Sequence, residues 1–334
     1  MLGDCSNKVD CGEEFMNKVW RPHKAITYHF LILPIYGRNT NPMKQSLIFL
    51  ILFTSLTFVS SGFAEKSYFD GDTLIVGYYG RPGAESLGVL GQHSVEELMP
   101  LIKAKAGGYA KLTGKKAIPA FHLIYGLATS DPGSDKDFIY PLSDHKVMEY
   151  INAAQDNEFA VIIDLQLGGM PPQQAVQSVL KYLQYDNVHL AIDPEFEVNG
   201  LDVPPGKVIG HITGEEINMV QSAMRDYLTK NDIQENKILI VHMFRKSMVS
   251  HKDVVKKYGN IDLIMNLDGH GSPQLKVKIY NSLYTEKAAS NVSGGLKLFF
   301  NEDKPVMLTP RQVMGMEDIG NARILEPPIY INFQ

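Results

Sequence analysis

Three acidic residues on alternate positions end one apolar segment of the chain. The segment VHLAIDPEFEV, residues 188 to 198, carries Asp193, Glu195 and Glu197. In an extended strand alternate side chains point to the same face, so we expect the three carboxylates on one side of the chain while it stays extended. Adjacent carboxylates push their pKa values apart, which suits one to act as an acid and another as a base. The pattern predicts acid–base chemistry at the end of a strand.

Several other segments repeat this arrangement, in which an apolar run closes in a polar residue. The acids predicted to be catalytic are Asp164, Asp193 and Glu195. The residues predicted to bind a substrate beside them are Tyr79, Arg81, His122, Gln166, His242, Asp268, His270 and Gln334. Each polar residue also has a structural interpretation, because an acid can cap the next helix and a histidine can be a hydrogen-bonded core residue.

The elements that must position these residues follow a regular alternation from residue 73 onward. Short apolar runs rich in β-branched residues alternate with segments of helical period, and Ser94 with Glu97 and Thr213 with Glu216 have capping-box spacing. Strands are predicted over residues 73–80, 116–128, 159–169, 188–198, 237–245, 261–271, 294–304 and 328–334.

This pattern predicts an α/β protein with a single (β/α)8 TIM-type barrel, in which the last strand pairs with the first. A doubly wound open sheet is the alternative, but no G-x-G-x-x-G or phosphate-binding glycine motif follows any predicted strand. In a barrel the carboxyl ends of the strands meet at one mouth, so the candidate residues should gather there.

Composition excludes several other classes of function. The formal net charge is -5, which argues against nucleic acid as a partner. Both cysteines, Cys5 and Cys11, precede the barrel region, so that region offers no disulfide, no thiolate nucleophile and no cysteine-bound zinc. We predict no cofactor and no metal from the motifs, and the sequence indicates no oligomeric state.

The N-terminal part of the chain contains a predicted export signal. Met43 and Lys44 precede an apolar stretch at residues 47–59, and small residues at 62 and 64 follow it. This is the layout of a secretory signal peptide, and the apolar stretch is short for the roughly 20 residues of a membrane anchor. We expect residues 1–42 to be an extension of the gene model, 43–64 the signal, and 65–334 an exported, periplasmic or extracellular barrel domain without a membrane span.

Several segments resemble a family of uncharacterised secreted bacterial proteins and lipoproteins. The segments are GYYGRPGAESLGVLG, VIIDLQLG, LAIDPEFEV and VHMF. The resemblance implies a glycosidase-like barrel over nearly all of the predicted mature chain and assigns no catalytic residues. The D-x-E of residues 193–195 is also similar to the end of the acidic strand motif of chitinase-type hydrolases, although Ala191 stands where that motif has an acid.

The leading hypothesis is a secreted glycoside hydrolase that acts on an envelope or extracellular polysaccharide. Glu195 would donate the proton, with Asp193 or Asp164 as nucleophile or electrostatic partner, since this chemistry needs two carboxylates. One alternative is a non-catalytic barrel that binds a glycan or a partner protein. Another is a metal-dependent hydrolase, whose ion would be bound by His242, Asp193, Asp268 and His270 without any compact His-rich motif.

The signal-peptide hypothesis makes a direct prediction about processing. Signal peptidase should cleave after Ala64, so intact-mass measurement of the exported protein should find Glu65 as the first residue. A mature protein that retains residues 1–42 would contradict both the signal and the start-site interpretation.

Overall fold

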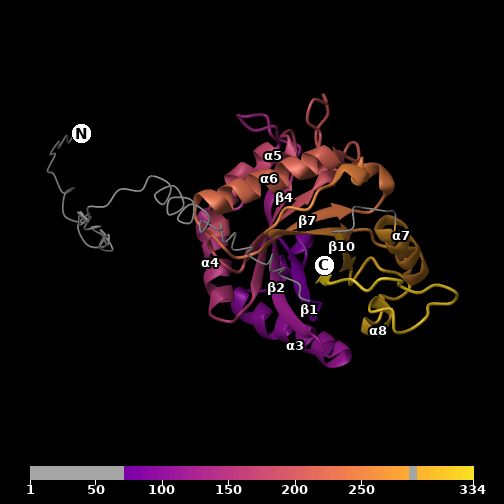
Figure 1. The fold of residues 1–334 in the computed structure, drawn as a ribbon. Coiled ribbons are helices and arrows are strands. Elements are labelled where there is room, and N and C mark those ends of the chain that lie inside the picture. The colour runs from indigo at the N-terminus through magenta and orange to yellow at the C-terminus, as the bar shows by residue number, and fades with distance from the viewer. Residues whose placement is uncertain (1–70, 286–291) are drawn as a thin grey trace, which may run out of the picture. The chain divides into compact units, whose positions relative to one another are not determined.

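Eight parallel strands form a closed barrel in the computed structural model, which describes residues 71–285 and 292–334 (Figure 1). The barrel strands are β1 (Thr73–Gly80), β2 (Lys116–Ala128), β4 (Ala160–Gln166), β5 (Val188–Asp193), β7 (Lys237–Met243), β9 (Ile261–Leu267), β10 (Val292–Leu298) and β11 (Tyr330–Phe333). The last strand pairs with the first, with Ile75 opposite Tyr330, and β1 pairs with β2 on its other side. The predicted (β/α)8 barrel is confirmed, while the predicted signal peptide lies outside the described residues.

Helices of very different length cover the outside of the barrel (Figure 1). The long ones are α3 (Val95–Thr113), α4 (Asp144–Gln155), α6 (Gly214–Lys230) and α7 (Pro273–Thr285); the short ones are α2 (Val89–Gln92), α5 (Pro172–Ala175) and α8 (Pro310–Val313). The predicted capping boxes open α3 and α6, where Ser94 and Thr213 accept the backbone N–H groups of Glu97 and Glu216. Among the described residues, no helix combines the length and hydropathy needed to cross a membrane.

The acidic segment departs from the predicted strand. Strand β5 ends at Asp193, and Pro194–Phe196 forms a turn of 3-10 helix in which the Asp193 carboxylate accepts the backbone N–H of Glu195. Proline has no N–H to continue a sheet ladder, so the chain leaves the extended conformation there. The expectation that Asp193, Glu195 and Glu197 share one face of a strand is therefore wrong.

Other local differences concern the connections. The helical segment between β4 and β5 is divided into α5 and two 3-10 turns, Val176–Ser178 and Leu180–Gln184. A short strand β3 (Ile139–Pro141) pairs antiparallel with the end of β2, and β6 (Ile212–Thr213) pairs with β8 (Val249–Ser250) outside the barrel.

Inward-pointing side chains fill the barrel in two layers of different chemistry. The apolar layer contains Ile75, Ala120, Ala160, Ile162, Ala191, Ile238, Ile240, Ile264 and Tyr330. Two residues further along several of these strands come buried polar side chains: His122, Asp164, His242, Asn266 and Asn332. Because alternate residues of a strand face the same side, the apolar run of each strand places the polar residue that follows it inside the barrel.

The apolar layer should carry much of the barrel's stability. Ile240→Ala removes a fully buried side chain and leaves a cavity between strands, so we expect a loss of about 2–5 kcal/mol in the free energy of unfolding. Urea unfolding measures the change. The matched control is Leu325→Ala, whose side chain is 65% exposed and whose loss should change stability by less than about 0.5 kcal/mol. Equal effects of the two substitutions would contradict the two-layer description.

Candidate functional site

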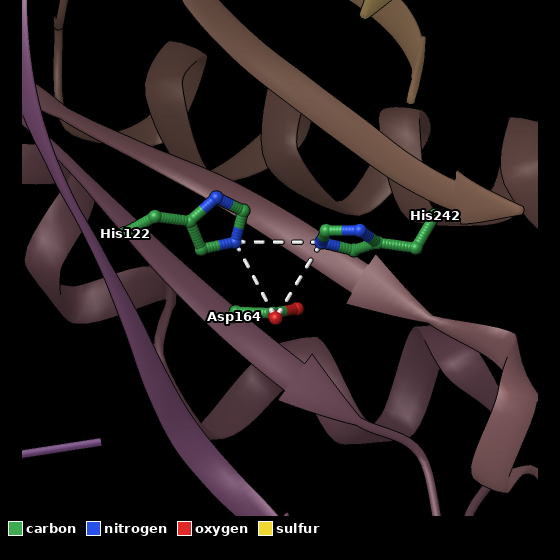
Figure 2. A group of neighbouring side chains, drawn as sticks. All are labelled: His122, Asp164 and His242. Carbon is green, nitrogen blue, oxygen red and sulfur yellow. Dashed lines mark hydrogen bonds and ion pairs between the residues drawn. The ribbon is translucent and has the colours of Figure 1, made fainter. Parts of the chain in front are cut away.

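Three side chains from separate strands converge in the middle of the barrel (Figure 2). His122 comes from β2, Asp164 from β4 and His242 from β7. The Nε2 atoms of the two histidines are 3.4 Å apart, and Oδ2 of Asp164 lies 3.4 Å from that of His122 and 3.5 Å from that of His242. All three side chains are 0% exposed.

The far side of each imidazole ring is held by another buried group. Nδ1 of His122 lies 2.5 Å from the hydroxyl of Tyr330, and Nδ1 of His242 lies 3.0 Å from Oδ2 of Asp268. The amide nitrogen of Asn266 lies 3.2 Å from the same Nδ1 of His242. These contacts fix the ring orientations, so both Nε2 atoms face Asp164.

The network continues from Asp268 to a buried lysine. Nζ of Lys297 lies 3.0 Å from one carboxylate oxygen of Asp268 and 3.2 Å from the other. The same ammonium lies 3.3 Å from the ring centroid of Tyr79, a cation–π contact. The Tyr79 ring in turn packs edge-on against His122, with the centroids 4.9 Å apart. Lys297 and Tyr79 therefore tie the histidine cluster to the strand ends.

Burial and pairing set opposite protonation states within this network. Burial lowers the pKa of His122 to about 4. Burial opposes the charge on His242 too, but the carboxylates of Asp164 and Asp268 prevail and raise its pKa to about 10. For Asp164 burial acts to raise the pKa, and the positive charge of His242 with the proximity of His122 holds it well below its usual range.

A pocket of about 370 Å³ lies at the strand ends. Its lining includes seven residues predicted from the sequence, Tyr79, Gln166, Asp193, Glu195, Asp268, His270 and Gln334. It also includes Lys297 and several apolar side chains: Leu87, Ile124, Phe196, Phe244, Ile279 and Phe299. The strand ends of the barrel therefore bring together acids, a buried cation and aromatic rings.

The remaining predicted residues lie elsewhere. Asp164, His122 and His242 do not line this pocket, but Tyr79 and Asp268 contact the histidines and line the pocket as well. Arg81 donates from Nη1 to the carbonyls of Ile124 and Tyr125, and from Nη2 to that of Tyr140. These bonds hold the end of β2 beside β3, so Arg81 stabilises the local structure.

The two acids of the 193–195 segment both have raised pKa values. Asp193 is buried, and burial together with the charges of Asp268, Asp164 and Glu195 outweighs His242 and raises its pKa to about 8. Glu195 is half-buried, and burial followed by the charge of Asp268 raises its pKa too. Asp268 differs, because burial is overcome by Lys297 and His242 and its pKa is lowered. The pocket thus contains acids of both kinds.

Three residues of the network were not predicted from the sequence: Lys297, Tyr330 and Asn266. A lysine inside the apolar strand segment GGLKLFF was the available signal, since a buried ammonium needs a partner. Tyr330 gave no such signal, because its hydroxyl meets His122 only through the closure of the barrel.

The metal ligands considered in the sequence analysis are only partly brought together. His242 contacts Asp268, whereas His270 is an exposed residue of the pocket rim. Within residues 71–285 and 292–334, the group whose donor atoms lie within 4.8 Å of one another is a different one: His122, Asp164 and His242.

The fold and site define a (β/α)8 barrel with a buried histidine–aspartate cluster below an acidic mouth pocket. No model of a known protein family matches the chain, and no curated protein matches it either. The site itself is therefore the basis for a function.

The raised pKa of Asp193 predicts a pH-dependent stability. Between its unfolded value near 4 and about 8, the folded chain keeps a proton that the unfolded chain releases, so stability falls as pH rises across this window, by at most about 1.4 kcal/mol per pH unit. Asp193→Asn should flatten this fall when urea unfolding is compared at pH 5 and pH 8. The control, Asp202→Asn, alters an exposed acid and should keep the wild-type slope. An unchanged slope in Asp193→Asn would contradict the assignment.

Proposed function

We propose that this protein is an exported glycoside hydrolase that acts on an envelope or extracellular polysaccharide. The observation that carries the proposal is the mouth pocket, in which Glu195 and Asp193 have raised pKa values and Asp268 is paired with Lys297. Glycoside hydrolysis needs a protonated carboxylic acid and a second, ionised carboxylate. Environments that separate carboxyl pKa values are the usual mark of such a pair.

Glu195 is the residue best suited to donate the proton. It is the more exposed of the two acids with raised pKa, so it can reach the oxygen of a leaving group in the pocket. Asp193 lies deeper, and its carboxyl oxygen accepts the backbone N–H of Glu195 at 3.0 Å. This bond positions Glu195, and Asp193 is a second acid with a raised pKa beside it.

Asp268 is the residue best suited to supply the negative charge. Contacts of 3.0 Å to Lys297 and to His242 stabilise its ionised form and fix its orientation at the pocket. It would act as nucleophile or as the base for a water molecule. Asp164 does not line the pocket, so its part is electrostatic and is transmitted through His242.

The apolar part of the pocket suits a sugar ring. Tyr79, Phe196, Phe244 and Phe299 line it together with the acids. Aromatic faces pack against the C–H surfaces of a pyranose while polar groups meet its hydroxyls, which is the mixture typical of small-molecule sites. The same mixture would serve a non-catalytic glycan-binding barrel, and the acid substitutions distinguish the two functions.

Glu195→Gln should lower turnover by roughly 10²- to 10⁴-fold, because it removes the titrating proton while keeping the side-chain shape. Release of reducing ends from a panel of polysaccharides, together with hydrolysis of aryl glycosides, measures the loss. Glu197→Gln is the matched control, an acid two residues away that is half-buried but does not line the pocket, and it should keep wild-type turnover.

Two results would count against the proposal. An active enzyme in which Glu195→Gln and Asp268→Asn both keep wild-type turnover would place the chemistry elsewhere. A wild-type protein that binds polysaccharide and hydrolyses none of the panel would favour the non-catalytic barrel.

A further inference from the structure

The histidine–aspartate cluster has the dimensions of a metal site. Three atoms, Nε2 of His122, Nε2 of His242 and Oδ2 of Asp164, form a nearly equilateral triangle with edges of 3.4, 3.5 and 3.4 Å (Figure 2). Ligands of a tetrahedral zinc ion, with bonds of 2.0–2.1 Å, are separated by roughly 3.3–3.4 Å. An octahedral ion with bonds of similar length would bring its ligands to about 3.0 Å. The triangle therefore matches tetrahedral coordination.

Hydrogen bonding accounts for this triangle less well. A charge-assisted N–H···O bond draws its atoms to about 2.7–2.9 Å, and a proton on one Nε2 can serve only one edge at a time. Here no edge is short, and neither oxygen of Asp164 receives a hydrogen bond of ordinary geometry from the described residues. Burial, followed by the negative charge of Asp164, raises the pKa of the Tyr79 phenol, which lies close to that carboxylate. An ion at the centre would contact all three atoms equally.

The groups behind the two imidazole rings are those that accompany metal-binding histidines. Such a histidine usually donates its other ring N–H to a carboxylate or a similar acceptor, which fixes the tautomer with a lone pair toward the metal. His242 presents Nδ1 to the carboxylate of Asp268, and His122 presents Nδ1 to the hydroxyl of Tyr330. Both contacts leave Nε2 directed at the centre of the triangle.

From this geometry we propose that His122, Asp164 and His242 bind a divalent transition-metal ion, zinc in preference to others. Two imidazoles and one carboxylate are a donor set that zinc accepts, and three protein ligands leave the fourth tetrahedral position to water or another small donor. The inference goes beyond the proposed hydrolase activity, because it concerns the layer below the pocket and holds whether or not Glu195 is catalytic.

Metal content tests the proposal directly on the tag-free full-length chain. After equilibration with zinc and removal of excess ion, elemental analysis should find one zinc per chain, and cobalt in its place should give the intense visible absorption of tetrahedral coordination. Zinc should also raise the midpoint of thermal unfolding above that measured with a chelator, since it binds the folded state. This last measurement uses the wild-type protein and does not depend on any variant folding.

Variants then assign the ligands. Asp164→Asn and His122→Gln should lose stoichiometric zinc, and Tyr330→Phe, which removes only the hydroxyl behind His122, should weaken zinc binding about 10- to 100-fold in a chelator competition. The matched control is His189→Gln, a histidine that is also fully buried on a barrel strand but belongs to no such group, and it should keep one zinc. Glu195→Gln should keep zinc as well, so a failed hydrolase assay does not affect this test.

Two outcomes would overturn the proposal. One is a folded wild-type chain that takes up neither zinc nor cobalt at micromolar free ion, in which case protonated His242 and Lys297 balance the carboxylates of Asp164 and Asp268. The other is zinc binding that is equally tight in Asp164→Asn and in the wild type, which would place the ion elsewhere.

Discussion

The burial of a carboxylate inside the barrel is the constraint on which the rest of the polar structure depends. Asp164 is fully removed from solvent, and an isolated charge there would cost many kcal/mol. The cost is offset by a chain of groups of alternating charge: Asp164 faces His242, His242 contacts Asp268, and Asp268 contacts Lys297. Because each member is also buried, removing one leaves its neighbour uncompensated. The positions of Asp268 and Lys297 in the pocket thus follow from the need to balance the charge of Asp164 deeper in the barrel.

The sequence predicted the parts of this structure that depend on strand periodicity. An apolar run with alternate residues inside must place the polar residue that follows it in the same interior. This is how Asp164, His122 and His242 come to lie together (Figure 2). Arg81 also follows a strand, yet its guanidinium turns to the backbone carbonyls of β2 and β3. Strand periodicity predicts that a residue lies near the barrel mouth. It does not predict whether the side chain will bond to nearby backbone carbonyls instead of facing the pocket.

Residues that depend on the pairing between distant strands were harder to foresee. Tyr330 reaches His122 from a position 208 residues away in the chain, and Lys297 reaches Asp268 across 29 residues. The Tyr330 contact needs closure of the barrel, which places β11 beside β1 and so near β2. The Lys297 contact instead joins the neighbouring strands β10 and β9. The prediction for the acidic segment was wrong for a local reason. Pro194 ends the strand, so the residues after it form a turn and no longer alternate between two faces. That turn still leaves Asp193 and Glu195 lining the same pocket.

Asp268 belongs to both layers, and its two contacts keep the proposed ion and the proposed acid chemistry separable. On the pocket side Lys297 pairs with it at 3.0 Å, and on the inner side His242 does so at the same distance. If His242 gives its Nε2 to a metal, its Nδ1–H still faces Asp268, so the hydrogen bond that orients this carboxylate is the same in either case. Lys297 does not contact the triangle of donor atoms, and it continues to favour the ionised carboxylate whether a proton or a metal ion balances Asp164. The pocket therefore keeps one stabilised anion, Asp268, beside two acids with raised pKa values, and neither the orientation nor the charge of that anion depends on the proposed ion.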